Sequence, residues 1–214
     1  MALIVETRGL HERIRGLYGI ADAGGAACDP EKLAISLLAG GCRLLQLRCK
    51  GWSEDDIVHV GVRIGRYCTN AGALFILNDH AHLVGSVGAQ GVHLGQLDVD
   101  TITARKQMPV GALLGRSTHS LVDIDEALRD ADYLAFGPIW PTTNTDRDKG
   151  SRGLDELAKV RQRVPKTTPL VAIGGVTADR LPALLALGVD AWAVIGTIRD
   201  ADDRVRATQS LLRI

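Results

Sequence analysis

Short apolar runs alternate with longer amphipathic stretches along the chain, and this alternation predicts strands separated by helices. The apolar runs lack a strict apolar–polar alternation, which is typical of strands buried on both faces of a parallel sheet. Eight such runs are expected to be strands, namely Leu17–Ile20, Leu44–Leu47, Ala73–Leu77, Gly91–Leu94, Ala112–Leu114, Tyr133–Phe136, Leu170–Ile173 and Ala191–Ile195.

Helix start and stop signals occur between these runs. Pro30–Ala39 has proline in its first turn and glycines directly after it. Ser53 can cap the next helix, where acidic residues follow in the first turn. Thr177 is expected to cap a helix over Ala178–Leu187, which Gly188 would end.

Eight strands that alternate with about eight helices predict a (β/α)₈ TIM barrel with parallel strands, formed as a single domain over residues 1–214. An open doubly wound sheet is the main alternative. It fits less well, because the GxGxxG turn of dinucleotide-binding sheets does not follow the first run at Leu17–Asp22.

Charge and cysteine content indicate which partners the protein is expected to bind and in which compartment it is expected to work. The 25 basic and 25 acidic residues give a net charge of zero, without the basic excess that nucleic acids or membrane surfaces attract. No apolar stretch approaches the roughly 18 residues of a membrane span, and no leader is recognisable. The four cysteines form no CxxC pair, so we expect free thiols in a reducing cytoplasm. The sequence is compatible with a homo-oligomer.

Polar residues follow the predicted strands, at the end of a barrel where active sites form. Arg48 and Lys50 flank Cys49, so on an extended chain both cations point to one face. Two converging cations favour an anion between them, such as a diphosphate. The alternative is pairing with the nearby acids Glu54 and Asp55.

Two carboxylates follow adjacent predicted strands. Asp79 and Asp98 could share Mg²⁺, which favours a few carboxylates together with substrate phosphate oxygens. Capping of helix N-termini is the alternative for each residue alone. Together with Arg48 and Lys50, a magnesium diphosphate site is the better account.

Glycines mark the last two predicted strand ends. Gly174-Gly175 and Gly196-Thr197 each precede a predicted helix, an arrangement that favours phosphate binding over simple turn formation.

The two histidines at strand positions differ in context. His93 lies inside an apolar run and is expected to pack in the core, whereas His119 lies beyond Ser117 and is an acid/base candidate. The long irregular stretch over residues 137–153 is interpreted as a lid or binding loop.

Several of these pieces occur together in the order of a known family. On them the chain resembles the thiamine phosphate synthase family along nearly its whole length. The matching pieces are Gln46-Leu47-Arg48-Cys49-Lys50, Asn78-Asp79, Gly91-Val92-His93-Leu94-Gly95-Gln96-Leu97-Asp98, Ser117-Thr118-His119, Gly137-Pro138-Ile139-Trp140-Pro141-Thr142 and Gly174-Gly175.

The resemblance implies an activity and a set of site residues. The family couples 4-amino-2-methyl-5-pyrimidinylmethyl diphosphate to 4-methyl-5-(2-phosphoethyl)thiazole and releases diphosphate. It implies that Asp79 and Asp98 hold Mg²⁺ and that Arg48, Lys50 and Ser117 are catalytic. The implied substrate-binding residues are Gln46, Leu47, Arg48, Cys49, Lys50, Asn78, Ser117, Thr142, Thr143, Asn144, Gly175, Ile195 and Gly196.

Two departures from the family pattern keep alternatives open. The family's lid reads Pro-Thr-x-Thr-Lys, but Asn144 and Thr145 replace its second threonine and its lysine. Arg147 or Lys149 could supply the missing cation. Without a replacement, a non-catalytic relative that binds thiamine precursors is an alternative.

The second departure is Arg116-Ser117-Thr118-His119. This stretch is similar to the related thiazole tautomerases, in which His119 would be the acid/base. That family often lacks the two magnesium aspartates, which this chain retains, so synthase is favoured.

Overall fold

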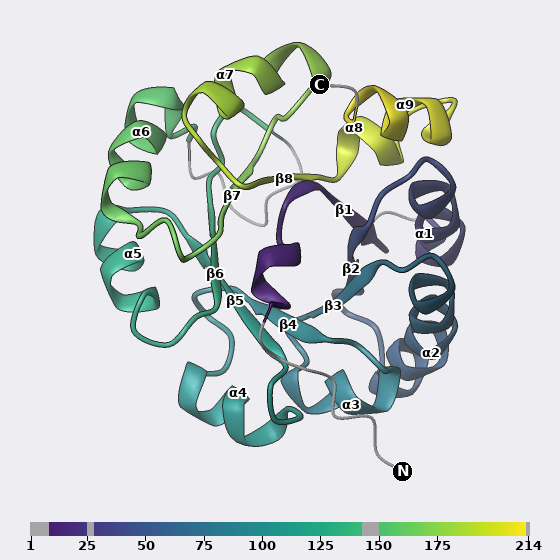
Figure 1. Cartoon of the computed structure of the whole chain (residues 1–214). Coiled ribbons are helices and arrows are strands. Elements are labelled where there is room, and N and C mark those ends of the chain that lie inside the picture. Colours follow the sequence, from purple (N-terminus) through teal and green to yellow (C-terminus); the bar gives the residue numbers. More distant parts are fainter. Residues whose placement is uncertain (1–8, 25–27, 143–149, 213–214) are drawn as a thin grey trace.

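The computed structural model describes residues 9–24, 28–142 and 150–212, which form a closed barrel of eight parallel strands inside a ring of helices (Figure 1). Each strand pairs with the next, and the first pairs with the last to close the barrel. The predicted fold is therefore confirmed. The strands are β1 (Gly16–Asp22), β2 (Leu44–Arg48), β3 (Leu74–Asn78), β4 (Gly91–Leu94), β5 (Leu113–Thr118), β6 (Tyr133–Phe136), β7 (Leu170–Ile173) and β8 (Ala191–Val194).

Helices follow the strands along the chain and pack around the outside of the barrel (Figure 1). The short 3₁₀ helix η1 (His11–Arg13) precedes β1. The other helices are α1 (Pro30–Ala39), α2 (Glu54–Asn70), η2 (Ala81–Leu83), α3 (Val84–Val87), α4 (Thr101–Gln107), α5 (Leu121–Ala127), α6 (Gly153–Arg163), η3 (Ala178–Arg180), α7 (Leu181–Ala186), α8 (Gly196–Arg199) and α9 (Arg204–Ser210).

The helix cap predicted at α2 is present, whereas the cap predicted for the helix after Thr177 is not. The Ser53 hydroxyl accepts a hydrogen bond from the Asp56 amide at the start of α2. Thr177 occupies the N-cap position of η3, but its side chain makes no capping bond. The predicted helix over Ala178–Leu187 is also a 3₁₀ turn followed by the shorter α7, so this prediction is partly wrong.

The core consists of two layers that the strands separate. One cluster fills the barrel interior and includes Tyr18, Leu44, Ile76 and Tyr133. The other lies between strands and helices and includes all three fully buried cysteines. Both faces of most strands are buried, which explains why the apolar runs do not alternate.

The fifth strand is longer than its apolar run. The sequence predicts Ala112–Leu114, but β5 continues to Thr118. Ser117 and Thr118 stay in the strand because they pair with Ala135 and Phe136 of β6. Ser117 is therefore a strand residue, held more rigidly than the predicted loop position would hold it.

Across the three described ranges, no helix is both long and apolar enough to cross a lipid bilayer.

Candidate active site

A cavity of about 430 Å³ opens at the carboxyl ends of the strands. Residues in or directly after β2 to β8 contribute to its wall, as expected for the active end of a barrel. The lining residues are Arg48, Lys50, Asn78, Asp79, Gly95, Gln96, Leu97, Asp98, Ser117, His119, Gly137, Pro138, Thr142, Ile173, Gly174, Gly175, Val176, Ala193, Val194, Ile195, Gly196 and Thr197.

Most of the predicted site residues line this one cavity. They are Arg48, Lys50, Asn78, Asp79, Asp98, Ser117, Thr142, Gly175, Ile195 and Gly196, together with the acid/base candidate His119.

Three predicted substrate-binding residues lie elsewhere. Leu47 and Cys49 are buried in the layer between strands and helices, on the opposite face of the chain from Arg48 and Lys50. Gln46 is also buried, and its amide donates a hydrogen bond of 2.8 Å to the Tyr18 hydroxyl. Alternation along β2 explains why Leu47 and Cys49 do not reach the cavity, whereas Gln46 lies on the same face as Arg48 and contacts Tyr18 in the barrel interior below the cavity.

Two further predicted residues, Thr143 and Asn144, lie outside the described part of the chain, as do Thr145, Arg147 and Lys149.

The two cations pair with acids other than Glu54 and Asp55, the partners named by the alternative interpretation of the sequence. Arg48 Nη1 lies 2.6 Å from Oδ1 of Asp22, the buried last residue of β1. Oδ2 of the same carboxylate lies 3.1 Å from Nη1 of Arg199. Lys50 Nζ lies 4.0 Å from Asp79 Oδ2. Asp22 therefore holds Arg48 in place, and neither interpretation of the sequence included this residue.

The two predicted metal ligands contact each other. Burial, reinforced by the adjacent Asp98 carboxylate, raises the pKa of Asp79 to about 7. The Asp98 carboxylate also accepts a hydrogen bond of 2.6 Å from the Gly95 amide. Asp79 has a left-handed backbone with φ 66°, which is unusual for a residue other than glycine.

Helix capping does not account for this pair. His80 precedes η2, and Asp100 caps α4. Two close carboxylates repel when both are ionised, and a divalent cation between them removes the repulsion. The pair therefore fits the Mg²⁺ that the family resemblance implies.

A chain of hydrogen bonds runs from the barrel interior to Ser117 at the cavity wall. The Tyr18 hydroxyl, which accepts from Gln46, lies 2.9 Å from the Tyr133 hydroxyl. The Tyr133 hydroxyl lies 3.1 Å from His93 Nδ1, and His93 Nε2 lies 3.0 Å from Ser117 Oγ. The fixed neighbours restrict the orientation of the serine hydroxyl.

His93 is neutral in this chain of hydrogen bonds. Burial, with a smaller contribution from Arg116, lowers the pKa of His93 to about 4. The sequence prediction that His93 packs in the core is confirmed, because the side chain is buried. The contact between His93 and Ser117 was not predicted. The two residues lie on neighbouring strands, His93 on β4 and Ser117 on β5.

The opposite wall is built by close backbone segments. Gly174 and Gly175 after β7 have φ of 98° and 65°, a region that favours glycine. A Cβ atom on Gly175 would lie 2.7 Å from Trp140 Cβ, so the wall leaves no room for a side chain. Thr197 Oγ1 donates a 2.7 Å hydrogen bond to the Val176 carbonyl, which ties the β7 and β8 loops together.

His119 also lines the cavity. Its Nδ1 lies 2.6 Å from the Gly137 carbonyl oxygen. A carbonyl oxygen only accepts, so Nδ1 donates, and in the neutral ring Nε2 carries the lone pair. The backbone amide of His119 donates to Asp123. Nε2 is therefore the ring nitrogen that is not committed to the Gly137 carbonyl.

Comparisons with known proteins agree with this geometry. A sequence profile described as thiamine monophosphate synthase matches residues 17–198. The thiamine-phosphate synthase of Methanocella arvoryzae is 36% identical over 203 residues, which cover 92% of this chain and 93% of that protein. That of Synechococcus sp. is 39% identical over 82% of this chain, but the chain spans only 49% of that longer protein.

A solved structure has the same architecture. The thiamine phosphate pyrophosphorylase from Pyrococcus furiosus superposes with a TM-score of 0.85 at 31% identity, covering 94% of this chain and 95% of that one. The profile match covers most of the chain, and the relatives are similar beyond the fold alone. The chain therefore belongs to the thiamine monophosphate synthase family.

Proposed function

We propose that the protein is a thiamine phosphate synthase, which joins an aminopyrimidinylmethyl diphosphate to a thiazole phosphate and releases diphosphate. One observation carries this assignment beyond family membership. A single cavity combines two cations, a carboxylate pair and a wall of glycine-rich backbone. That combination suits one small-molecule substrate with a diphosphate and a second with a phosphate.

The diphosphate is expected to bind where β2, β3 and β4 end. Arg48 and Lys50 line this side of the cavity and supply positive charge toward its oxygens. Asp22 fixes the Arg48 guanidinium, so little reorganisation is needed when charge builds up on the leaving group. Asp79 and Asp98 would hold Mg²⁺, which when bound neutralises diphosphate charge.

The reaction exchanges one bond for another. The bond between the pyrimidinylmethyl carbon and the diphosphate oxygen breaks, and its electron pair leaves with the oxygen. The thiazole nitrogen lone pair then forms the new carbon–nitrogen bond. Ser117, whose hydroxyl contacts His93, would hold the pyrimidine ring. Exclusion of water from the cavity protects the electron-deficient carbon.

The thiazole phosphate is expected to bind at the opposite wall. Gly175, Ile195 and Gly196 bring the backbone close to the cavity, and Thr142 offers a hydroxyl. We expect Arg147 or Lys149 to supply the cation that Thr145 cannot, in a protein that works in the cytoplasm on small-molecule substrates.

Thiazole tautomerase is the second candidate function, because His119 lines the same cavity with Nδ1 committed to a carbonyl. In that reaction, Nε2 would transfer a proton on the thiazole ring. Arg116, the other tautomerase-like residue, faces away from the cavity by strand alternation with Ser117. The synthase is therefore favoured.

Purified protein with both substrates, with and without Mg²⁺, tests the proposal. The synthase predicts thiamine phosphate that depends on Mg²⁺ and persists at a reduced rate in His119→Ala. Turnover of a thiazole carboxylate phosphate that His119→Ala abolishes, without any thiamine phosphate, would establish the tautomerase instead. Tight binding of both substrates without either product would identify a binding protein.

A further inference from the structure

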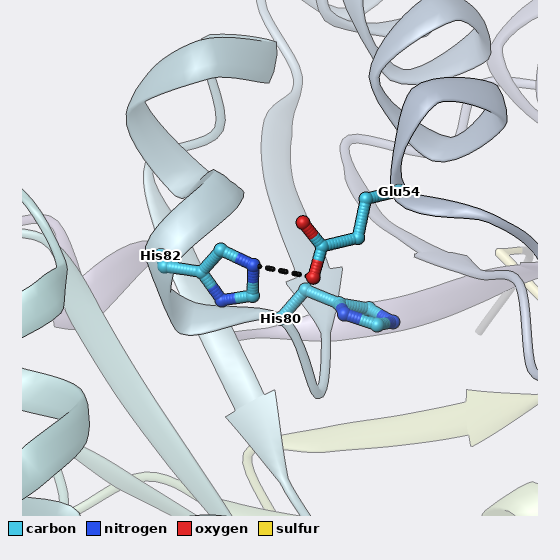
Figure 2. Close-up of side chains that lie close together, drawn as sticks. All are labelled: Glu54, His80 and His82. Carbon is cyan, nitrogen blue, oxygen red and sulfur yellow. Dashed lines mark hydrogen bonds and ion pairs between the residues drawn. The ribbon is translucent and has the colours of Figure 1, made fainter.

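A second group of metal-ligating side chains lies outside the cavity wall described above. Glu54 is the first residue of α2, and His80 and His82 lie in the segment after β3 (Figure 2). Oε1 of Glu54 is 2.9 Å from His82 Nε2. One potential ligand atom from each of the three residues lies within 4.8 Å of the others.

The three side chains approach each other from two separate segments. The fold brings Glu54 next to His82, although they are 28 residues apart in sequence. The two imidazoles have ring centroids 6.1 Å apart and an interplanar angle of 71°. The two imidazoles come from one short segment, and the Glu54 carboxylate is drawn between them in Figure 2.

The distances are close to those of a metal site. Zinc–nitrogen bonds of about 2.0 Å place neighbouring ligands of a tetrahedral ion about 3.3 Å apart. The His82–Glu54 separation is already shorter than this, and the remaining separations are at most 4.8 Å. Glu54 and His82 are well exposed, so their side chains have room to rotate toward the shorter separation.

We propose that Glu54, His80 and His82 form a binding site for a divalent transition-metal ion of the Zn²⁺ type, separate from the carboxylate pair in the cavity. Two imidazoles and a carboxylate suit zinc, cobalt or nickel and do not suit Mg²⁺, which requires oxygen ligands. Three protein ligands leave the fourth position to water. This assignment does not depend on the proposed synthase activity.

An isolated ion pair explains the cluster less well. An exposed His–Glu contact contributes little to stability, and it accounts for only two of the three side chains. His80, the third, adjoins Asp79 of the cavity, and Glu54 begins the helix that follows the Lys50 loop. A bound ion would therefore connect two segments that carry cavity residues.

The decisive measurement is a calorimetric titration of the full chain with Zn²⁺ in the presence of excess Mg²⁺. The excess Mg²⁺ occupies the oxygen-ligand pair, and Asp98→Asn is included as a variant that should leave zinc binding unchanged. We expect one Zn²⁺ per chain and at least about tenfold weaker binding in His80→Ala, His82→Ala and Glu54→Gln.

Two controls identify the ligands. His59→Ala removes an exposed histidine elsewhere on α2, and Cys28→Ser removes a partly exposed thiol; both should bind like the wild type. Co²⁺ should give the visible absorption of a four-coordinate site in the wild type and lose it in His82→Ala. Thermal unfolding should shift upward with Zn²⁺ in the wild type only.

Absence of stoichiometric zinc binding would overturn the proposal. So would binding that survives both His80→Ala and His82→Ala, or that disappears in Cys28→Ser or Asp98→Asn. The three ligand variants change exposed or half-buried side chains, so each is expected to fold, and thermal unfolding without metal verifies this.

Discussion

Replacement of Asp98 by asparagine tests the carboxylate pair most sharply. The Asp79 carboxyl has its pKa raised from 3.8 to about 7, by burial first and by Asp98 second. Asparagine keeps the shape and an oxygen that can accept from the Gly95 amide, but it removes the charge. The variant therefore isolates electrostatics from packing.

The sign of the effect follows from proton linkage. A carboxyl whose pKa is raised in the folded state keeps its proton between pH 4 and 7, whereas the unfolded chain has lost it. Its contribution to stability is therefore present below about pH 4 and is lost as pH rises through 7. Above that pH, Asp79 is ionised in the folded state, where it is buried and next to Asp98. The free energy of unfolding is then lowered by the full cost of this charge.

The change in the free energy of unfolding in Asp98→Asn equals the part of this cost that the Asp98 charge causes. Two unit charges about 4 Å apart interact by about 4 kcal/mol at an effective dielectric constant of 20. Lys50 Nζ, 4.0 Å from Asp79, offsets part of this repulsion. We therefore expect Asp98→Asn to raise the free energy of unfolding by about 1–2 kcal/mol at pH 8 without Mg²⁺.

Thermal unfolding at pH 5 and pH 8, with and without Mg²⁺, measures this. A gain of 1 kcal/mol corresponds to about 2–4 °C for a chain of this size. At pH 5, below the raised pKa of Asp79, this carboxyl carries a proton, so the gain should be small. Mg²⁺ should stabilise the wild type and not Asp98→Asn. A variant with an equal or lower midpoint at pH 8 without Mg²⁺ would refute the reasoning.

Three further substitutions probe the other parts of the site. Asp22→Asn leaves the Arg48 and Arg199 guanidinium groups without their shared carboxylate. The free energy of unfolding, measured by urea denaturation, should fall by about 2 kcal/mol, and the kcat/KM for the pyrimidine diphosphate should also fall. Tyr133→Phe breaks the buried hydrogen-bond chain; the urea midpoint should report a loss of about 1–2 kcal/mol, and an unchanged KM for the pyrimidine diphosphate would argue against a positioning role. Gly175→Ala requires a left-handed alanine and should weaken calorimetric binding of the thiazole phosphate more than that of the pyrimidine diphosphate; equal weakening would contradict the assigned wall.

The fold was predictable because its signals are local. Each strand coincides with a short apolar run, and strands such as Gly91–Leu94 and Tyr133–Phe136 have the predicted bounds. Strand β5 was underestimated, because its last residues Arg116, Ser117 and Thr118 are polar; of these three, Ser117 lines the cavity. A hydrophobic pattern cannot report a strand end that is held by pairing with a neighbouring strand.

The site was predictable where strand ends carry unusual residues. Arg48, Lys50, Asp79 and Asp98 were found because parallel strands bring their carboxyl ends together. The resemblance to a family added Gln46, whose side chain the structure places below the cavity wall.

Contacts between distant residues were missed. Asp22 is 26 residues from Arg48 and 177 from Arg199, so no local pattern reveals that it joins them. The Tyr18–Tyr133 contact spans 115 residues across the barrel interior. A signal was present at Asp22, a charged residue that ends an otherwise apolar strand. Its partners required the closed barrel to be known.

The central claim is that the carboxylate pair in the cavity supports Mg²⁺-dependent formation of thiamine phosphate. The most direct test is the initial rate of thiamine phosphate formation against Mg²⁺ concentration for the wild type, Asp79→Asn and the matched control Asp55→Asn, an exposed carboxylate of α2. We predict that the control retains the wild-type rate and Mg²⁺ dependence, while Asp79→Asn loses at least about a hundredfold in rate. An Asp79→Asn variant with the wild-type rate and Mg²⁺ dependence would contradict the account.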